Sequence, residues 1–180
     1  MLYNLKADKW VECFYRRVEG INEINEFSPP KWRFEFLADY QEGYEIFALE
    51  TKEYQGIAQG IVALKVVQEE YAVHLKSAET ADSNKYYIRG EKRNGVNKDR
   101  IYKGVGTNLV AFACQYSLEN KYDGFMYLIS KTTTIPFYEK FGGEMLSKNS
   151  QTIFFDEKNG GNMARKYFQG GAIKWVEQKF

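Results

Sequence analysis

The segment Gly56–Val67 constrains the fold most, because apolar residues occupy both faces of its alternating pattern. A half-exposed strand alternates apolar and polar residues, whereas a strand that is apolar on both faces lies inside a covered sheet. The segment is therefore predicted to be a central strand. Residues 44–50 and 71–78 also have strand patterns. The second of these should form an antiparallel hairpin with the central strand through the short turn at 68–70.

Helix and strand patterns alternate in the second half of the chain. Helices are predicted over 104–120, 134–141 and 163–168, and buried strands over 125–129 and 151–155. The pair Gly142-Gly143 is a typical helix end and closes the second of these helices. The element order predicts a mixed fold of helices and strands.

The N-terminal forty residues carry weaker patterns. Trp10, Cys13, Phe14 and Arg17 are spaced as on one helix face, which predicts a short helix or a strand–helix junction. Pro29 and Pro30 then interrupt the chain. The preceding Ser28 is expected to lead into another helix, with Trp32, Phe36 and Leu37 on one face.

The composition is that of one globular domain. A chain of 180 residues buries roughly 70% of the surface that its unfolded form exposes, so it needs no disulfide or metal to build a core. The content of 44% hydrophobic and 27% charged residues excludes a disordered tail, a coiled coil and a collagen. The longest apolar run, Leu109–Cys114, is far shorter than the roughly 20 residues of a membrane span.

The N-terminus and the cysteines indicate a cytoplasmic protein. The first eight residues lack the apolar core of a signal peptide. Cys13 and Cys114 have no metal-ligand spacing, and Cys114 lies in an apolar helical pattern that is typical of a reduced thiol. His74 is the single histidine, which excludes any metal site or mechanism that needs two. We therefore predict no metal site and no membrane contact.

Charge is concentrated in one segment, although the net charge of the chain is only +1. Lys85–Lys103 holds seven basic and two acidic residues, together with glycines and asparagines that predict a loop. Such a loop is either a solvated face or a surface for phosphate groups.

A glycine-rich segment follows this loop directly. Gly104 and Gly106 stand at the start of the predicted helix, in the sequence Lys103-Gly104-Val105-Gly106-Thr107. The start of a helix presents unpaired N–H groups and a partial positive charge, and glycine lets an anion approach the backbone. The segment suits a pyrophosphate. It is neither a Walker loop nor a dinucleotide fingerprint, because position 109 is leucine and no Gly-Lys-Ser/Thr ending is present.

A second motif, Phe137-Tyr138-Glu139-Lys140-Phe141-Gly142-Gly143, lies on the helix after the buried strand 125–129. Together with the central strand, the basic loop and the Gly-x-Gly segment, it resembles the Gcn5-related N-acetyltransferases. Their phosphate loop is Gln/Arg-x-x-Gly-x-Gly/Ala, and a later helix commonly ends in Leu/Phe-Tyr-x-x-x-Gly-Phe. Ile101 stands at the Gln/Arg position, with Arg100 beside it.

The resemblance covers Gly56 to Phe155 and implies an α/β fold of the α+β type. That fold has a central, mostly antiparallel twisted sheet with a splayed parallel strand pair, flanked by helices. It implies a single N-acetyltransferase domain over 1–180. Residues 1–55 would form the acceptor side, 56–158 the acetyl-CoA-binding core and 159–180 a C-terminal extension.

The resemblance also implies acetyl-CoA as cosubstrate and transfer of its acetyl group to a primary amine. Tyr138 would protonate the departing CoA thiolate. The residues expected to bind the cofactor are Ala81, Arg100, Tyr102, Lys103, Gly104, Val105, Gly106, Thr107, Asn108 and Lys131. Lys131 stands where many members have an asparagine that touches the cofactor arm.

The amine must lose a proton before it attacks. At pH 7 this costs about 4–5 kcal/mol for an amine with a pKa near 10.4. Glu79, at the expected strand end, is the candidate base, with His74 or water as alternatives. Aromatic residues of the first third, among them Phe14, Tyr15, Phe27 and Trp32, are expected on the acceptor side.

Several alternatives stay open at this point. The protein could be a CoA-binding or regulatory module without turnover, or a nucleic-acid-binding domain that uses the basic segment 85–103. The net charge of +1 argues against nucleic acid. The acceptor is open among a small amine, an antibiotic, a protein N-terminus, a lysine and an aminoacyl-tRNA, and a homodimer is also open. We expect the basic loop, with Arg93, Lys98 and Arg100, to cover the adenosine end of CoA, and Tyr86 or Tyr87 to pack at its base.

Overall fold

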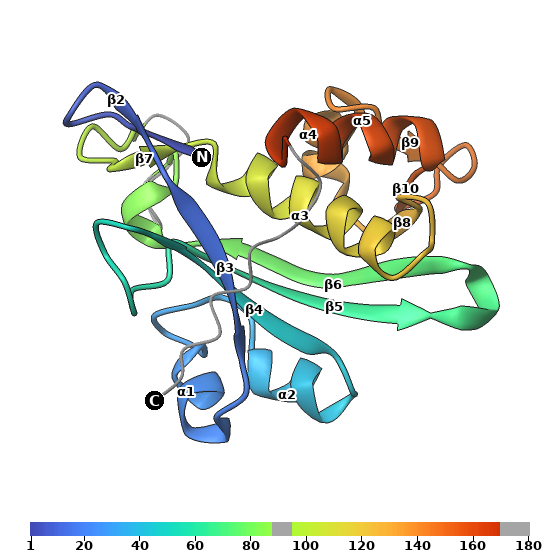
Figure 1. Cartoon of the computed structure of the whole chain (residues 1–180), viewed down its shortest axis with the longest axis horizontal. Coiled ribbons are helices and arrows are strands. Elements are labelled where there is room, and N and C mark those ends of the chain that lie inside the picture. The colour runs from blue at the N-terminus through green and yellow to red at the C-terminus, as the bar shows by residue number, and fades with distance from the viewer. Residues whose placement is uncertain (88–94, 170–180) are drawn as a thin grey trace. The chain divides into compact units, whose positions relative to one another are not determined.

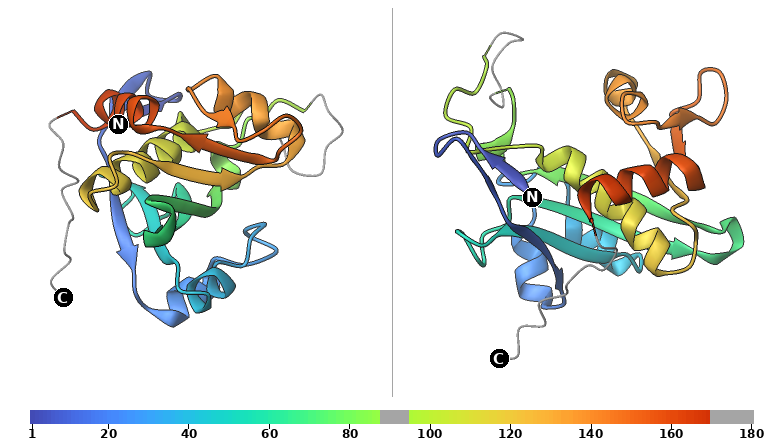
Figure 2. Two further views of the ribbon diagram at one scale, coloured as in Figure 1. Left: turned by 90° about the vertical axis from the view of Figure 1, so that its right-hand side faces the viewer. Right: turned by 45° about the horizontal axis from the view of Figure 1, so that its top comes forward.

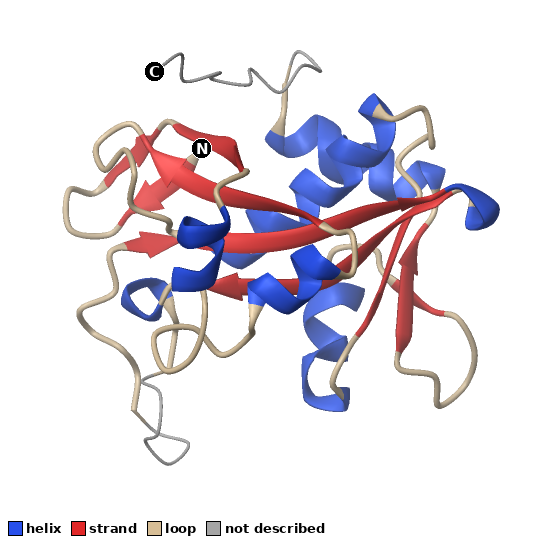
Figure 3. Cartoon of the chain, turned by 90° about the horizontal axis from the view of Figure 1, so that it is seen from below, coloured by secondary structure: helices blue, strands red, loops and turns tan. Residues whose placement is uncertain are grey.

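The structure is a computed structural model of the chain that describes residues 1–87 and 95–169 (Figure 1). Helices and strands are distinguished by colour in Figure 3. The strands are β1 (Leu2–Asn4), β2 (Lys9–Val11), β3 (Cys13–Val18), β4 (Glu45–Thr51), β5 (Gly60–Val67), β6 (Ala72–Thr80), β7 (Tyr102–Lys103), β8 (Met126–Ile129), β9 (Glu144–Met145) and β10 (Thr152–Phe155). The α-helices are α1 (Ile21–Glu26), α2 (Phe36–Gln41), α3 (Val105–Glu119), α4 (Ile135–Glu139) and α5 (Glu157–Tyr167). Short 3-10 turns are η1 (Gln68–Glu70), η2 (Asp82–Asn84) and η3 (Thr132–Thr134).

The strands form two sheets. The larger has seven strands in the order β3-β4-β5-β6-β8-β10-β9, and the smaller has the order β2-β1-β7. β6 and β8 are parallel, with Val73 opposite Met126 and Leu75 opposite Leu128, whereas β3–β4, β8–β10 and β9–β10 are antiparallel. The predicted mixed sheet with one parallel strand pair is therefore confirmed, and β5 is a central strand as its apolar pattern indicates.

Two compact units make up the described residues. The first comprises residues 1–63 and 77–109, and the second comprises residues 64–76 and 110–169. β5, β6 and α3 each contribute residues to both units.

The first unit is built on the antiparallel pair β3–β4, whose register runs from Cys13 opposite Thr51 to Val18 opposite Ile46. α1 and α2 lie beside this pair (Figures 1 and 2). Their apolar residues form one buried cluster with the strands, which includes Val18, Ile24, Phe27, Trp32, Phe36, Ile46, Ala48 and Ile61. The first unit thus has its own core.

Of the two alternatives for Trp10–Arg17, the short helix is wrong, whereas the strand–helix junction agrees with β3 and with α1, which follows it along the chain. These residues form β2 and β3 instead, and Cys13–Val18 is paired with β4 along its whole length. A six-residue strand ladder with Tyr15 and Val18 buried outweighs the weak helical spacing. The helix expected after Ser28 begins only at Phe36, and Trp32 is buried in the preceding turn.

The start of α3 packs closely on β5. A Cβ atom on Gly60 would lie 2.8 Å from Cγ1 of Val105 and 3.1 Å from Cδ1 of Leu109. Only glycine at the start of the central strand therefore allows this approach. Gly104 has φ +93°, which places the turn before the helix in the left-handed region that favours glycine.

The second unit contains β8, β9 and β10 with α4 and α5. Asp156 caps α5, since its carboxylate accepts a hydrogen bond of 2.7 Å from the Asn159 N–H. This helix begins six residues before the segment that the apolar pattern indicated. α4 covers residues 135–139 of the helix that is predicted at 134–141. Among the described residues, no helix combines the length and the apolar character that crossing a membrane requires.

Candidate active site

The first turn of α3 forms an open backbone cradle. The first helical hydrogen bond runs from the Asn108 N–H to the Gly104 carbonyl at 2.9 Å, so the N–H groups of Val105, Gly106 and Thr107 have no acceptor within the helix. A Cβ atom built on Gly104 would meet nothing within 4 Å. The first turn carries no acidic side chain that would compete with an anion. We call Gly104 and the three free N–H groups the anion cradle.

Two residues of the predicted cofactor set point their side chains into the protein. The Tyr102 hydroxyl lies 3.3 Å from the Thr51 hydroxyl and donates a hydrogen bond to Glu53 at 3.1 Å. The Asn108 side-chain carbonyl accepts a hydrogen bond of 2.7 Å from the buried Tyr15 hydroxyl. We therefore still predict that Tyr102 and Asn108 help to bind the cofactor, but through their backbone groups and not through their side chains.

The base of the basic loop is held in place. The Asn97 N–H donates to the Tyr86 carbonyl at 2.8 Å, and Tyr87 is bridged to Val96. Tyr86 and Tyr87 pack edge to face, and the Arg100 guanidinium lies 5.2 Å from the Tyr86 ring centre. Residues 88–94, with the predicted phosphate contact Arg93, lie outside the described residues.

The chain then leads from this base to the anion cradle. The Ile101 N–H donates to the Ser83 carbonyl at 3.1 Å, and Lys103 is exposed in β7. Lys98 is also exposed. These cations are accessible to a ligand.

Glu79, the candidate base, is buried and fully engaged. One carboxylate oxygen accepts hydrogen bonds from the N–H groups of Arg33 at 2.7 Å and Phe34 at 3.2 Å. The other accepts from the Lys85 ammonium at 2.7 Å. For Glu79 to accept a proton from an amine, one of these three hydrogen bonds would first have to break. The geometry favours a structural anchor that holds the loop before α2.

β6 continues past its partner. The register with β8 covers Val73–Leu75, whereas β6 runs on to Thr80 and is followed by Ala81. Ala81 donates its N–H to the Gln59 carbonyl at 3.0 Å, which ties this end of β6 to the start of β5. The strand therefore ends next to the segment that enters the central strand.

Tyr138 and Lys131 belong to the second unit. Burial raises the pKa of Tyr138 above its usual value of 10.0. Its ring packs edge to face on Phe137 at 5.1 Å, and the hydroxyl has no hydrogen-bond partner in the described residues. Lys131 is exposed at the turn before α4. A protonated phenol without an internal partner can act as a proton donor.

His74, the alternative base, stacks on Tyr127 with ring centres 4.5 Å apart. Burial, followed by the charge of Lys76, lowers its pKa below 6.5. The imidazole is therefore neutral at pH 7, and it forms part of the packing between β6 and β8.

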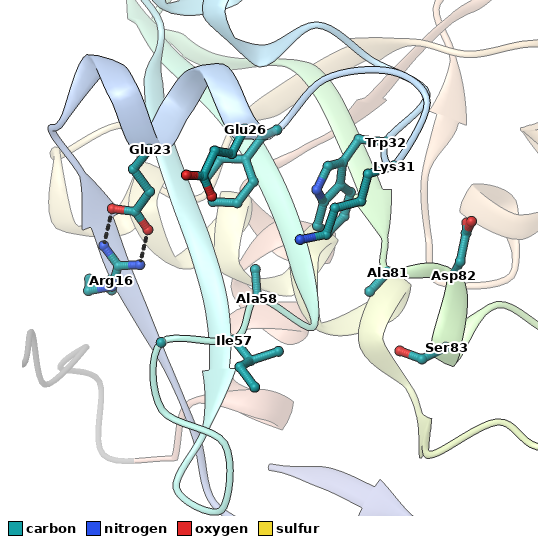
Figure 4. A pocket seen from close by; sticks show the side chains of 12 residues that line it. Arg16, Glu23, Glu26, Lys31, Trp32, Ile57, Ala58, Ala81, Asp82 and Ser83 are labelled. Atoms are coloured by element: carbon teal, nitrogen blue, oxygen red, sulfur yellow. Dashed lines mark hydrogen bonds and ion pairs between the residues drawn. The ribbon is translucent and has the colours of Figure 1, made fainter.

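A cavity of about 370 Å³ lies in the first unit (Figure 4). We call it the charged pocket. It is lined by Arg16, Glu23, Glu26, Phe27, Lys31, Trp32, Gly56, Ile57, Ala58, Ala81, Asp82 and Ser83. Phe27, Trp32 and Ala81 belong to the predicted acceptor and cofactor residues.

Sequence reasoning missed the polar residues of the charged pocket. Glu26 and Lys31 are exposed, and neither has a partner in the described residues. The Trp32 indole nitrogen is buried and has no acceptor there either. No local motif marks these residues, because the pocket gathers short pieces of five segments. No group of histidine, cysteine and carboxylate side chains in the described residues could hold a metal ion.

Comparison with known proteins agrees with this arrangement at the level of the fold. No family model and no curated protein sequence matches the chain. Among solved structures, AtaTR bound with acetyl-CoA superposes with a TM-score of 0.56 at 14% identity, covering 84% of this chain and 98% of that one. The KacTA–DNA complex gives a TM-score of 0.56 at 14% identity, covering 86% and 99%.

A candidate acetyltransferase of Exiguobacterium sp. 255-15 gives a TM-score of 0.53 at 16% identity, covering 84% of this chain and 98% of that one. The fold is that of the Gcn5-related N-acetyltransferases. In this chain, the fold appears as the seven-stranded sheet with β6 and β8 paired in parallel. An identity near 15% shows the fold alone.

Proposed function

We propose that the protein is an acetyl-CoA-dependent N-acetyltransferase that acts on a primary amine. The observation that carries the proposal is the anion cradle at the start of α3, in a fold of which one solved member, AtaTR, is bound with acetyl-CoA. A helix N-terminus with free N–H groups and no acidic side chain binds a pyrophosphate.

The acetyl group is transferred by direct attack. The neutral amine nitrogen bonds to the thioester carbonyl carbon, the carbon–sulfur bond breaks, and the thiolate takes a proton. Tyr138 supplies that proton in our proposal, because burial keeps its phenol protonated. Thiolates leave readily, since a thiol pKa is near 8.5, so the phenol contributes about 10²–10⁴ in rate.

Glu79 serves as an anchor in this proposal. Its carboxylate accepts hydrogen bonds from Arg33 and Phe34. These two residues come directly after Trp32, which lines the charged pocket. The proton lost by the amine passes to solvent, because the charged pocket is open and its free groups, Glu26 and Lys31, are exposed.

The experiment is a transfer assay on the purified protein. Acetyl-CoA is mixed with a panel of amines, free CoA thiol is measured, and mass spectrometry identifies the acetylated product. Binding of acetyl-CoA and formation of an N-acetyl amine are expected. Binding without product for any amine would favour the regulatory module instead, and failure to bind acetyl-CoA would contradict both.

A toxin role is a second candidate, because several matched structures are toxins. AtaT is a toxin that was solved with the antitoxin AtaR, and KacTA was solved with DNA. Induced expression in a bacterial host should then stop growth, and the Tyr138→Phe variant should not. Normal growth at high expression of the folded protein would exclude this role.

A further inference from the structure

We infer that the charged pocket binds an aliphatic diamine, with one ammonium group at Glu26 and the other amine directed at the end of β6. This inference rests on the proposed function, because it names the acceptor of that transfer. It follows from the distribution of charge along the pocket and from the apolar residues between its ends.

The end of the pocket near α1 is acidic. Arg16 donates to Glu23 at 3.1 Å and to Glu50 at 2.9 Å, so its charge is already shared by two carboxylates. Glu26 lies on the same helix as Glu23 and has no partner in the described residues. This end therefore has an excess of negative charge and one carboxylate that is free to bind a cation.

The middle of the pocket is apolar. Ile57, Ala58 and the rings of Phe27 and Trp32 line it, and the two rings pack edge to face with centres 5.8 Å apart. This surface matches a chain of methylene groups.

The side of the pocket toward β6 contains Lys31, a cation without a partner among the described residues. Lys31 precedes Arg33 by two residues, and the Arg33 N–H is bonded to Glu79 on β6. Figure 4 shows the Lys31 side chain passing Trp32 with its ammonium directed toward Ala58, and Glu26 on the other side of Ala58. The other cation there, Lys85, is shared by two carboxylates, since it donates to Asp82 at 2.6 Å and to Glu79 at 2.7 Å.

The two ends together orient the ligand. Lys31 repels an ammonium group, so the charged end of a diamine is directed to Glu26 and the neutral form is favoured at the other end. That neutral amine lies toward Ala81, which follows the β6 segment where the cofactor arm is expected. Its nitrogen bonds to the thioester carbonyl carbon, the carbon–sulfur bond breaks, and the amine proton passes to solvent.

The test compares acceptors of one chain length. Cadaverine has two amines on a five-carbon stem, 1-aminopentane lacks the distal amine, and 5-aminopentanoic acid reverses the distal charge. We expect kcat/KM for cadaverine to exceed that for 1-aminopentane by about fivefold or more, the effect of a partly exposed ion pair. The acid should be the poorest of the three. Equal values for the three acceptors would overturn the inference.

The variant Glu26→Gln tests the residue. It should reduce the preference for cadaverine over 1-aminopentane to about twofold or less, through KM. The matched control is Glu19→Gln, an exposed carboxylate of the same unit outside the pocket. This control should keep the wild-type preference. An unchanged preference in Glu26→Gln, or an equal loss in both variants, would contradict the role of Glu26.

Calorimetric titration separates this inference from the proposed function. Cadaverine should bind the protein without acetyl-CoA, and Glu26→Gln should weaken that binding about fivefold. Such binding without any acetyl transfer would support the pocket and contradict the proposed function. Acetylation of other amines, with no binding or turnover of cadaverine, would contradict the pocket and leave the proposed function standing.

Discussion

The anion cradle and the charged pocket lie in the same unit, yet they are built in opposite ways. The cradle consists of Gly104 and the backbone N–H groups of Val105, Gly106 and Thr107, and the two glycines leave the approach to these groups without a side chain. The charged pocket consists of side chains from β3, α1, the turn before α2, the entry to β5 and the η2 turn. A backbone site is encoded locally, whereas a side-chain site is encoded by the whole fold. The two should therefore respond to different substitutions.

The largest expected effect comes from a charge in the anion cradle. Gly106→Asp places a carboxylate against the pyrophosphate and should abolish the rise in melting temperature that acetyl-CoA produces. At 100 times Kd the lost stabilisation is ~2.7 kcal/mol. An aspartate in a first helical turn favours the helix, so loss of binding would not reflect unfolding. Gly106→Ala is the control, and equal ligand shifts in the Asp variant and the wild type would show that the cradle is misassigned.

The motifs of the cradle could be predicted from the sequence because neighbours in the chain make them. The strands and the helix around the cradle could also be predicted, since β5 is apolar on both faces and α3 has a long apolar pattern. β3 could not, because its strand conformation depends on pairing with β4 about thirty residues later. The hydrogen bonds of Glu79 could not be predicted either. Two of its three donors, Arg33 and Phe34, stand 46 and 45 residues earlier in the chain, and the third is Lys85.

The variant Tyr138→Phe tests whether acetyl transfer depends on a residue that belongs to neither the anion cradle nor the charged pocket. It removes one hydroxyl and keeps the ring, so kcat should fall about 10²-fold while the Kd of acetyl-CoA stays constant. The raised pKa of Tyr138 sets the sign of the pH dependence: the phenol stays protonated up to and beyond pH 10. In the wild type, kcat should therefore rise with pH as the amine loses its proton. It should not fall again below pH 10, because Tyr138 keeps its phenol proton there. An unchanged kcat in the variant would remove Tyr138 from the mechanism.

Variants of Glu79 test whether the charged pocket depends on the hydrogen bonds that this carboxylate accepts from Arg33 and Phe34. Glu79→Ala leaves the N–H groups of Arg33 and Phe34 without their acceptor, and we expect stability to fall by about 1–3 kcal/mol and KM for the amine to rise. Glu79→Gln keeps a carbonyl oxygen for these N–H groups. It should restore most of the stability and of KM, with kcat close to wild type. A collapse of kcat in Glu79→Gln, with KM unchanged, would instead identify Glu79 as the base.

The smallest effect is expected where side chains extend the backbone cradle. Lys98 and Arg100 lie on the segment that leads to Gly104, and CoA carries a 3′-phosphate beside its pyrophosphate. Replacing both cations by Ser should raise the Kd of CoA several-fold at low salt, because each exposed contact contributes at most about 1 kcal/mol. Salt should weaken the effect, and dephospho-CoA should show a smaller one. Lys52→Ser, at an exposed ion pair with Glu12, is the matched control. Equal losses for CoA and dephospho-CoA would show that these cations do not contact the 3′-phosphate, and would leave recognition to the backbone of the cradle alone.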